Sequence, residues 1–145
     1  MSDELRPEPD AGASRVIEPA GWPRPRGYAH GILSAGVLAV SGQIGWDPET
    51  LAPAGGGIAT QTRQALANVL AVVHAAGMTA ADVALLTWYV TDRDEYVTAR
   101  ATIGSAYRAL FGGHFPAMSV VIVAGLVEVW AKVEIEATAI RRSPG

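Results

Sequence analysis

The sequence contains no cysteine, which excludes disulfide bonds, a thiolate nucleophile and metal sites built on cysteine ligands. Lysine is nearly absent as well, because Lys132 is the only one. The 11 basic residues are outnumbered by 14 acidic residues, for a net charge of −3, and the arginines are scattered. Binding to a polyanion needs clustered cations. We therefore expect no nucleic-acid partner.

Long apolar runs are missing too. No run reaches the roughly 18 residues that a membrane-spanning helix needs. The acidic, proline-rich start of the chain also lacks the basic segment and apolar core of a secretory signal. We therefore expect a cytoplasmic protein with no membrane partner.

The composition indicates one folded domain. The chain has 145 residues, of which 50% are hydrophobic and 17% are charged, a balance that is not typical of disorder. We find no internal repeat and no long linker. The expected organisation is a mobile tail at residues 1–13, a single domain at residues 14–142 and a short tail at residues 143–145.

Hydrophobic spacing predicts an α+β fold. Apolar residues recur at helical spacing in two segments, and the C-terminal segment alternates apolar and polar residues, as a strand with one buried face does. Other segments are short and rich in β-forming residues. The expected strands are 15–18, 31–34, 37–44, 83–91 and 127–140, and the expected helices are 58–76 and 92–111.

Two helices are enough to cover one face of a mixed sheet of five or six strands. Strands 37–44 and 83–90 nevertheless carry apolar side chains on both of their faces. No sequence remains for further helices, so the second face needs another cover. A symmetric partner subunit is the simplest cover, and we therefore expect a homo-oligomer.

Two carboxylates are candidates for acid–base chemistry. Glu134 and Glu136 stand two residues apart on the last predicted strand, so they project from the same face about 7 Å apart. In a partly dry cleft, the pKa of a carboxyl group rises and the group can move a proton near neutral pH. The alternative is a solvated strand face on which Lys132 pairs with these carboxylates. The sequence leaves both readings open.

Other features of the sequence give weaker indications of a catalytic or binding site. Ser41–Gln43 ends a predicted strand with a glycine that would let a ligand approach the backbone, and Gly55–Gly57 lacks the pattern of a phosphate-binding loop. Trp46 and Trp130 are unusually placed, and they line either a pocket or an interface. No serine lies in a GxSxG turn. The histidines show no metal-ligand spacing, so we expect no metal at His30, His74 and His114.

Seven short motifs follow one another along residues 14–142 and carry a family resemblance. They are Gly27–His30, Ser41–Ile44, Asp47–Thr50, Gln61–Asn68, Val90–Asp92, Phe115–Ser119 and Val133–Ala137. In this order and with these gaps they resemble the RidA (YjgF) family of reactive-intermediate imine and enamine deaminases.

The resemblance implies a chorismate-mutase-like α+β fold, assembled as a homotrimer with a cleft between each pair of subunits. Members of the family hydrolyse 2-imino acids and 2-aminoacrylates to 2-keto acids and ammonia without a cofactor or metal. By position in the motifs, Glu134 matches the glutamate that handles the attacking water. Tyr28, Ser41 and Gly42 match residues that line the cleft, and the backbone near Val120 helps to hold the water.

Two departures from the family pattern bear on the substrate. Met118 stands where the family has the arginine that binds the substrate carboxylate, and a thioether cannot replace a bidentate cation. Gly104 stands where the family has a cleft asparagine, three residues before Tyr107. Arg26 is a candidate replacement cation. We expect a hydrolase with altered specificity or, alternatively, a non-catalytic trimer that binds a small molecule or a protein; the nuclease activity sometimes assigned to the family is not expected.

Overall fold

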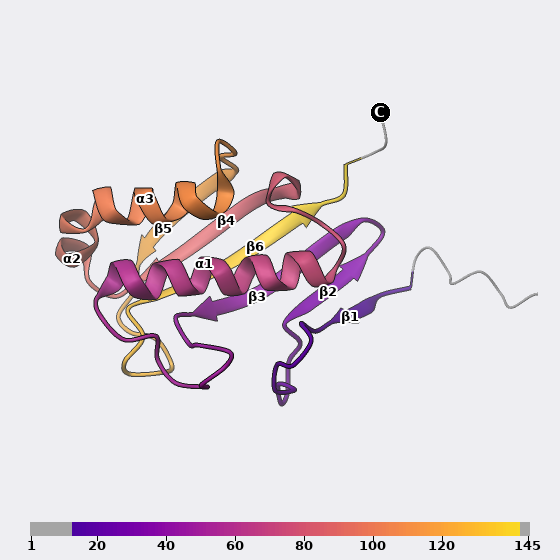
Figure 1. The fold of residues 1–145 in the computed structure, drawn as a ribbon, viewed down its shortest axis with the longest axis horizontal. Helices are drawn as coiled ribbons and strands as arrows, with labels where there is room; N and C mark the ends of the chain where they lie inside the picture. Colours follow the sequence, from indigo (N-terminus) through magenta and orange to yellow (C-terminus); the bar gives the residue numbers. More distant parts are fainter. Residues whose placement is uncertain (1–12, 143–145) are drawn as a thin grey trace, which may run out of the picture.

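The computed structural model describes residues 13–142, which form one six-stranded sheet with helices packed against it (Figure 1). The predicted C-terminal tail, and the N-terminal tail apart from residue 13, lie outside the described residues. None of the described helices is both long enough and apolar enough to cross a membrane. The strands are β1 (Arg15–Ile17), β2 (Gly31–Ser34), β3 (Val37–Ile44), β4 (Val83–Val90), β5 (Ala117–Ile122) and β6 (Val133–Ile140). The helices are α1 (Ile58–Ala75), a short 3-10 turn η1 (Ala80–Asp82), α2 (Arg93–Thr98) and α3 (Arg100–Phe111).

The strand order in the sheet is β1-β2-β3-β6-β4-β5. All neighbours are antiparallel except β4 and β5, which run parallel. The predicted hairpin of 31–34 and 37–44 is present, with Ala35 and Gly36 at positive φ in its turn. The C-terminal strand β6 therefore lies at the centre of the sheet, between β3 and β4, where its side chains are held on both sides.

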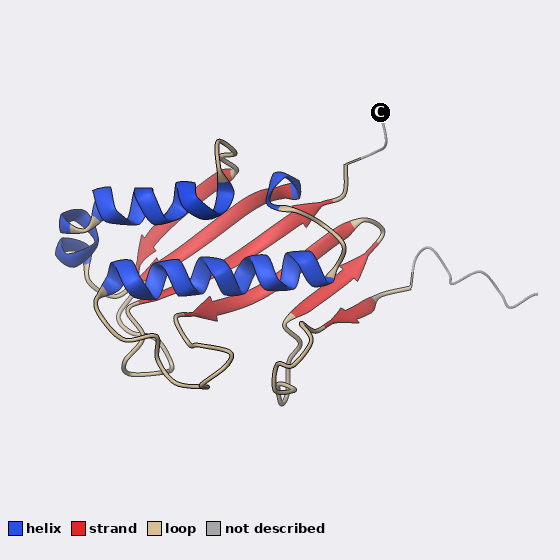
Figure 2. Cartoon of the chain, in the orientation of Figure 1, coloured by secondary structure: helices blue, strands red, loops and turns tan. Residues whose placement is uncertain are grey.

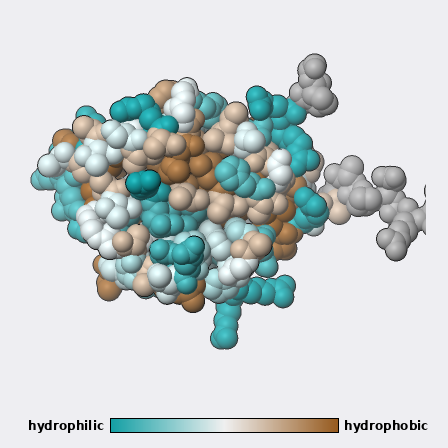
Figure 3. Space-filling view, viewed as in Figure 1, coloured by the Kyte–Doolittle hydropathy of each residue, from teal (hydrophilic) through white to brown (hydrophobic). Residues whose placement is uncertain are grey.

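The helices cover one face of the sheet (Figure 2). Helix α1 buries the apolar residues that recur along it, such as Leu66, Val69 and Val73, against the sheet side chains Leu38 and Ile135. The outer surfaces of the helices face the viewer in Figure 3, where most of the surface is hydrophilic or intermediate and brown areas are small. Burial of one apolar face and exposure of a polar one explain why these segments are helical.

No described element covers the opposite face of the sheet. Along β6 the side chains alternate between buried positions on the helix side and half-exposed ones on the other side, where Glu134 and Glu136 lie. Large apolar side chains remain exposed at other positions of the strands, including Val37, Leu85 and Ile140. A face of this kind is typical of a contact surface in a larger assembly.

The predicted helix 92–111 is wrong as a single element, because the chain forms α2 and α3 with a break at Ala99. Asp92 caps α2 as its position suggested, and its carboxylate accepts a hydrogen bond from the Glu95 backbone N–H at 2.9 Å. Ala99 ends α2 and begins α3. Alanine is the best helix former, and nothing in the local sequence marks this break. The sheet thus carries three α-helices rather than the two expected.

The predicted strand 127–140 is also wrong in its first part, since β6 begins only at Val133. Val127 and Val129 belong to a loop and are 98% and 99% exposed. Their alternation with polar residues reflects no sheet pairing in this chain. Strand β5 was not predicted, because it is an edge strand whose apolar residues show no alternation. With β5 the sheet has six strands, the larger of the two numbers expected from the sequence.

Asn68 joins helix α1 to the end of β3. Its amide is buried and donates hydrogen bonds to the carbonyl oxygens of Ile44 at 3.1 Å and Trp46 at 2.9 Å. These two carbonyls lie at the last residue of β3 and just beyond it, where the chain leaves the sheet. A buried amide therefore fixes the point at which the following loop begins.

We predict that Asn68→Ala lowers the free energy of unfolding by about 1–3 kcal/mol, because two partly buried carbonyls lose their donors. Urea unfolding followed by circular dichroism measures this change. Arg63→Ala, an exposed position on the same helix, is the matched control and is expected to change stability by less than about 0.5 kcal/mol. Equal effects of the two substitutions would contradict this role of Asn68.

Candidate functional site

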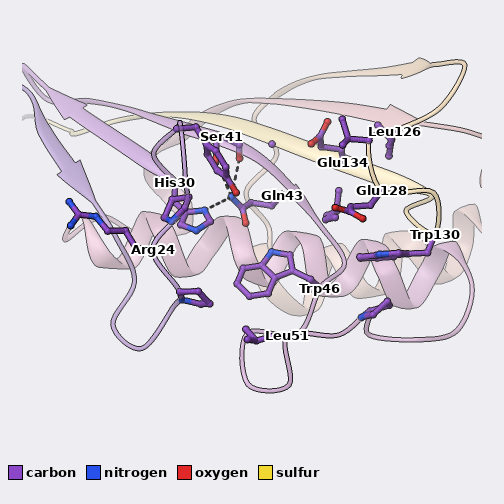
Figure 4. A pocket seen from close by; sticks show the side chains of 17 residues that line it. Arg24, His30, Ser41, Gln43, Trp46, Leu51, Leu126, Glu128, Trp130 and Glu134 are labelled. Atoms are coloured by element: carbon purple, nitrogen blue, oxygen red, sulfur yellow. Dashed lines mark hydrogen bonds between the residues drawn. The ribbon is translucent and has the colours of Figure 1, made fainter.

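A cavity of about 730 Å³ opens at the end of the sheet where β3 finishes (Figure 4). Its walls come from four parts of the chain: residues 23–30, the last residues of β3 with the loop to residue 53, the loop at 126–130, and Glu134 on β6. The volume lies in the range of small-molecule sites. The cavity therefore gathers residues that are far apart in sequence around the carboxylate of Glu134.

A β-bulge in β3 shapes the wall next to that carboxylate. Val40 pairs with Ala137 and Gln43 pairs with Ile135, so three steps along β3 match two steps along β6. Ser41 and Gly42 lie in the resulting bulge, between two buried positions. Bulges of this kind bend a strand and change where its side chains point.

Gly42 lies directly against Glu134. A Cβ atom at position 42 would stand 2.7 Å from both Cδ and Oε1 of Glu134, closer than real contacts allow. The glycine thus gives the carboxylate its place against the bulged backbone. The sequence suggested that this glycine lets a ligand approach the backbone. In the structure the group that lies against Gly42 is the side chain of Glu134.

Burial raises the pKa of the Glu134 carboxyl group, and the negative charge of Glu136 raises it further. Within residues 13–142, no group donates a hydrogen bond to Glu134, whereas Glu136 accepts one from the Tyr89 hydroxyl at 2.7 Å. Lys132 does not pair with either carboxylate as the sequence suggested; its ammonium group binds Glu95 at 2.8 Å. Of the two carboxylates, Glu134 is the one free to accept a proton inside the cavity.

Gln43 and His30 support the bulge from behind. The Gln43 amide donates to the backbone oxygen and to the hydroxyl of Ser41, both at 3.2 Å, and lies 3.3 Å from Nδ1 of His30. Burial lowers the pKa of His30, with Glu18 acting in the opposite direction. The sequence raised His30 only as a candidate metal ligand and gave no sign of this role, since the contact joins β3 to the residue before β2.

Aromatic side chains form much of the remaining wall. Trp46 stacks on His30 with ring centroids 6.3 Å apart and meets Trp22 edge-on at 4.9 Å. Trp130 is held through its backbone oxygen, which accepts a hydrogen bond from Gln61 of α1 at 3.1 Å. Of the two alternatives that the sequence left open, pocket or interface, Trp46 and Trp130 both line the pocket.

Four of the seven predicted site residues line this cavity: Tyr28, Ser41, Gly42 and Glu134. The other three do not, because they lie on α3 and on the edge strand β5, which β4 separates from β6. A single chain therefore does not bring the two groups together. These three residues are Gly104, Met118 and Val120.

The cations near the site also differ from expectation. Arg26 is exposed and does not line the cavity, whereas Arg24 does. The guanidinium group of Arg24 lies 3.8 Å from Glu18 and points away from Glu134 (Figure 4). In the part of the chain that the structure describes, no three histidine, aspartate or glutamate side chains gather as a metal site.

We predict that Glu134→Gln raises stability at neutral pH. A raised pKa means that the folded state holds the proton of this carboxyl group more tightly than the unfolded state, so the ionised form at pH 7 disfavours folding. The gain in Tm should shrink as the pH falls through the folded pKa toward about 4. Glu49→Gln, an exposed acidic residue outside the cavity, is the control and should leave Tm unchanged. A loss of stability in Glu134→Gln at pH 7 would refute the assignment.

Comparisons with known proteins agree with this geometry. The Endoribonuclease L-PSP family model matches residues 23–141. The 2-iminobutanoate/2-iminopropanoate deaminase of Salmonella typhimurium is 42% identical over 118 residues, which cover 79% of this chain and 88% of that protein. The human protein of the same name is 34% identical, covering 88% of this chain and 90% of its own length. The crystal structure of the Escherichia coli YjgF gene product has a TM-score of 0.77 at 36% identity, covering 88% of this chain and 99% of that one. The chain thus belongs to the Endoribonuclease L-PSP family, the family of the YjgF/RidA proteins.

Proposed function

We propose that this protein is a hydrolase that adds water to the C=N bond of a small imine, or of the imine form of an enamine, without a cofactor or metal. The observation that carries the proposal is the Glu134 carboxylate. It lies in a cavity, has a raised pKa and has no hydrogen-bond donor among the described residues. The deaminase names of the relatives support the same class of reaction.

In the proposed reaction, Glu134 takes a proton from a water molecule as the water oxygen attacks the imine carbon. The resulting carbinolamine receives a proton on nitrogen, its C–N bond breaks, and ammonia leaves as a carbonyl compound forms. A raised pKa makes Glu134 a stronger base and lets it return the proton to the nitrogen. Tyr28 and the Ser41 hydroxyl stand at the cavity wall, where they can orient the substrate.

The proposal includes a homotrimer. The exposed apolar side chains on the uncovered sheet face support such an assembly, because leaving them in water is unfavourable. It also explains why Gly104, Met118 and Val120 lie far from the cavity of their own chain. In a trimer, these residues would reach the cavity of a neighbouring copy.

Specificity in the proposal follows from Met118. The thioether has no N–H groups to donate to a carboxylate. A 2-imino acid therefore loses the two charge-assisted hydrogen bonds that an arginine supplies. The flexible apolar side chain of methionine favours a less acidic substrate instead. We therefore expect weak activity on 2-iminobutanoate and 2-iminopropanoate.

Nuclease activity, which the matched family's description suggests, has less support in this chain. Two of the cavity's lining residues are acidic, and the arginines are scattered along the sequence. Phosphate recognition depends on clustered positive charge. A non-catalytic trimer that binds a metabolite or a protein is the alternative that the next experiment separates from the hydrolase.

We predict that Glu134→Gln lowers the rate of imine hydrolysis on the order of 10²–10⁴-fold, because the amide cannot accept the proton of water. Ammonia release from imines generated in situ measures the rate. Light scattering should give both proteins the mass of three 15.1-kDa chains. Unchanged hydrolysis in the variant would refute the role of Glu134, hydrolysis by the parent no faster than the uncatalysed rate would leave the binding module as the function, and a monomeric mass would refute the assembly.

We predict that Met118→Arg raises the hydrolysis of 2-iminobutanoate on the order of 10²-fold, since the guanidinium group can form charge-assisted bonds with the carboxylate. The comparison is the ratio of kcat/KM values for variant and parent. Met118→Leu keeps an apolar side chain of similar size and should leave the rate at the parent level. No gain in the arginine variant would show that the cavity has diverged at more than this position.

A further inference from the structure

We infer that the cavity selects a small organic cation, such as the iminium form of an imine that carries no carboxylate, over an anionic or zwitterionic 2-imino acid. The inference rests on the proposed function and specifies the substrate class of the same site. It follows from three separate properties of the cavity wall: its charge, its aromatic surface and its unused hydrogen-bond acceptors.

Two carboxylates make part of the wall negative, one half-buried on β6 and one exposed on the loop at 126–130. Glu134 and Glu128 both line it, and Figure 4 shows Glu128 between Glu134 and Trp130. Arg24 is the only cationic residue among the lining residues that the structure describes. Its side chain is 87% exposed, lies near Glu18 and points away from both cavity glutamates. An anionic ligand would face two carboxylates with no compensating cation, which is unfavourable.

The aromatic surface suits a cation with an apolar body. Trp46, Trp130 and Tyr28 come from three different segments and line the same cavity. The faces of aromatic rings attract cations, most strongly those of tryptophan, and bind ammonium groups in sites of this composition. Leu51 and Leu126 add apolar surface beside the rings. A carboxylate gains nothing from ring faces, because both are regions of negative charge.

The unused hydrogen-bonding capacity of the wall consists of acceptors. Gln43 is 2% exposed, and its Oε1 atom has no hydrogen-bond partner although its amide nitrogen is fully engaged with Ser41 and His30. Figure 4 shows this oxygen turned toward the side of Trp46. Glu134 likewise has no donor among residues 13–142. The Gln43 oxygen is sealed from solvent, so Glu134 is the acceptor of the two that a ligand can reach, and it is complementary to a ligand that brings N–H groups.

An iminium substrate satisfies all three properties and fits the proposed chemistry. The water oxygen bonds to the carbon of R₂C=NH₂⁺ as Glu134 takes one water proton, and the C=N electron pair moves to nitrogen. Glu134 then returns its proton to that nitrogen, the C–N bond breaks as the carbonyl forms, and the hydroxyl proton passes to the departing ammonia. The balance is R₂C=NH₂⁺ + H₂O → R₂C=O + NH₄⁺, with equal charge on both sides and no oxidant or reductant.

The binding test uses three probes of one shape and different charge: cyclohexylammonium, cyclohexanol and cyclohexanecarboxylate. Calorimetric titration of the full chain at pH 7.5 should show that the cation binds at least about tenfold more tightly than the carboxylate. Glu128→Gln should weaken the cation at least about threefold, whereas Glu49→Gln, with the same change in net charge outside the cavity, should not. Preference for the cation that depends on Glu128 supports the inference.

Preference for the carboxylate would overturn the inference. Arg108 provides the diagnostic variant for that outcome, because its guanidinium group lies 3.4 Å from the position that a Cβ atom of Gly104 would occupy. Carboxylate binding that is lost in Arg108→Gln would show that this arginine supplies the cation from a neighbouring copy. Equal affinities for all three probes would also contradict the inference, since the cavity would then not discriminate charge.

The kinetic arm separates the inference from the proposed function. Imines released in situ from a primary amine by an amine oxidase lack a carboxylate, and those released from an amino acid by an amino-acid oxidase carry one. The inference expects kcat/KM to be at least about tenfold higher for the first class. Hydrolysis that depends on Glu134 but favours the second class overturns the inference and leaves the proposed function standing. Cation-selective binding without hydrolysis of either class overturns the proposed function alone.

Discussion

The contact between the Glu134 carboxylate and the backbone of Gly42 is the interaction on which the rest of the site depends. It exists because the bulge in β3 leaves a stretch of main chain without a Cβ atom beside the central strand β6. The carboxylate fills that space, is withdrawn from water and has its pKa raised by burial. Gln43 and His30 hold the bulge from the buried side, so the position of the carboxylate is set by the core rather than by a surface loop.

The sequence predicts those helices and strands in which buried residues recur at a regular spacing. The helix at 58–76 and the hairpin of 31–34 and 37–44 were predicted nearly to their ends, because one face of each packs on the core. The sequence predicts the wrong structure where the spacing of apolar residues does not reflect their burial. Residues 127–132 alternate without pairing in any sheet, and β5 at the edge alternates too little to be seen. The break between α2 and α3 has no local cause in the sequence.

The site could be predicted only in part, for a related reason. Strand alternation placed Glu134 on one face, and the resemblance to a family gave it a role, but neither could show that the face is enclosed. The cavity walls beside Glu134 include Trp46 and Trp130, which loops bring together from positions 84 residues apart. The link between Gln43 and His30 joins β3 to the residue before β2, and only the pairing of these strands reveals it.

The bulge in β3 also limits how this segment can change in length. Val40 and Gln43 both point into the core because one surplus residue lies between them. Removing Ser41 or Gly42 would restore regular pairing and leave Gln43 facing the core two residues after Val40, but it would also remove the bulge and the bend that it gives to β3 beside Glu134. This stretch is therefore closed both to a deletion and to a side chain at position 42, and variants of the protein with a different substrate range should be sought among substitutions in the surrounding loops.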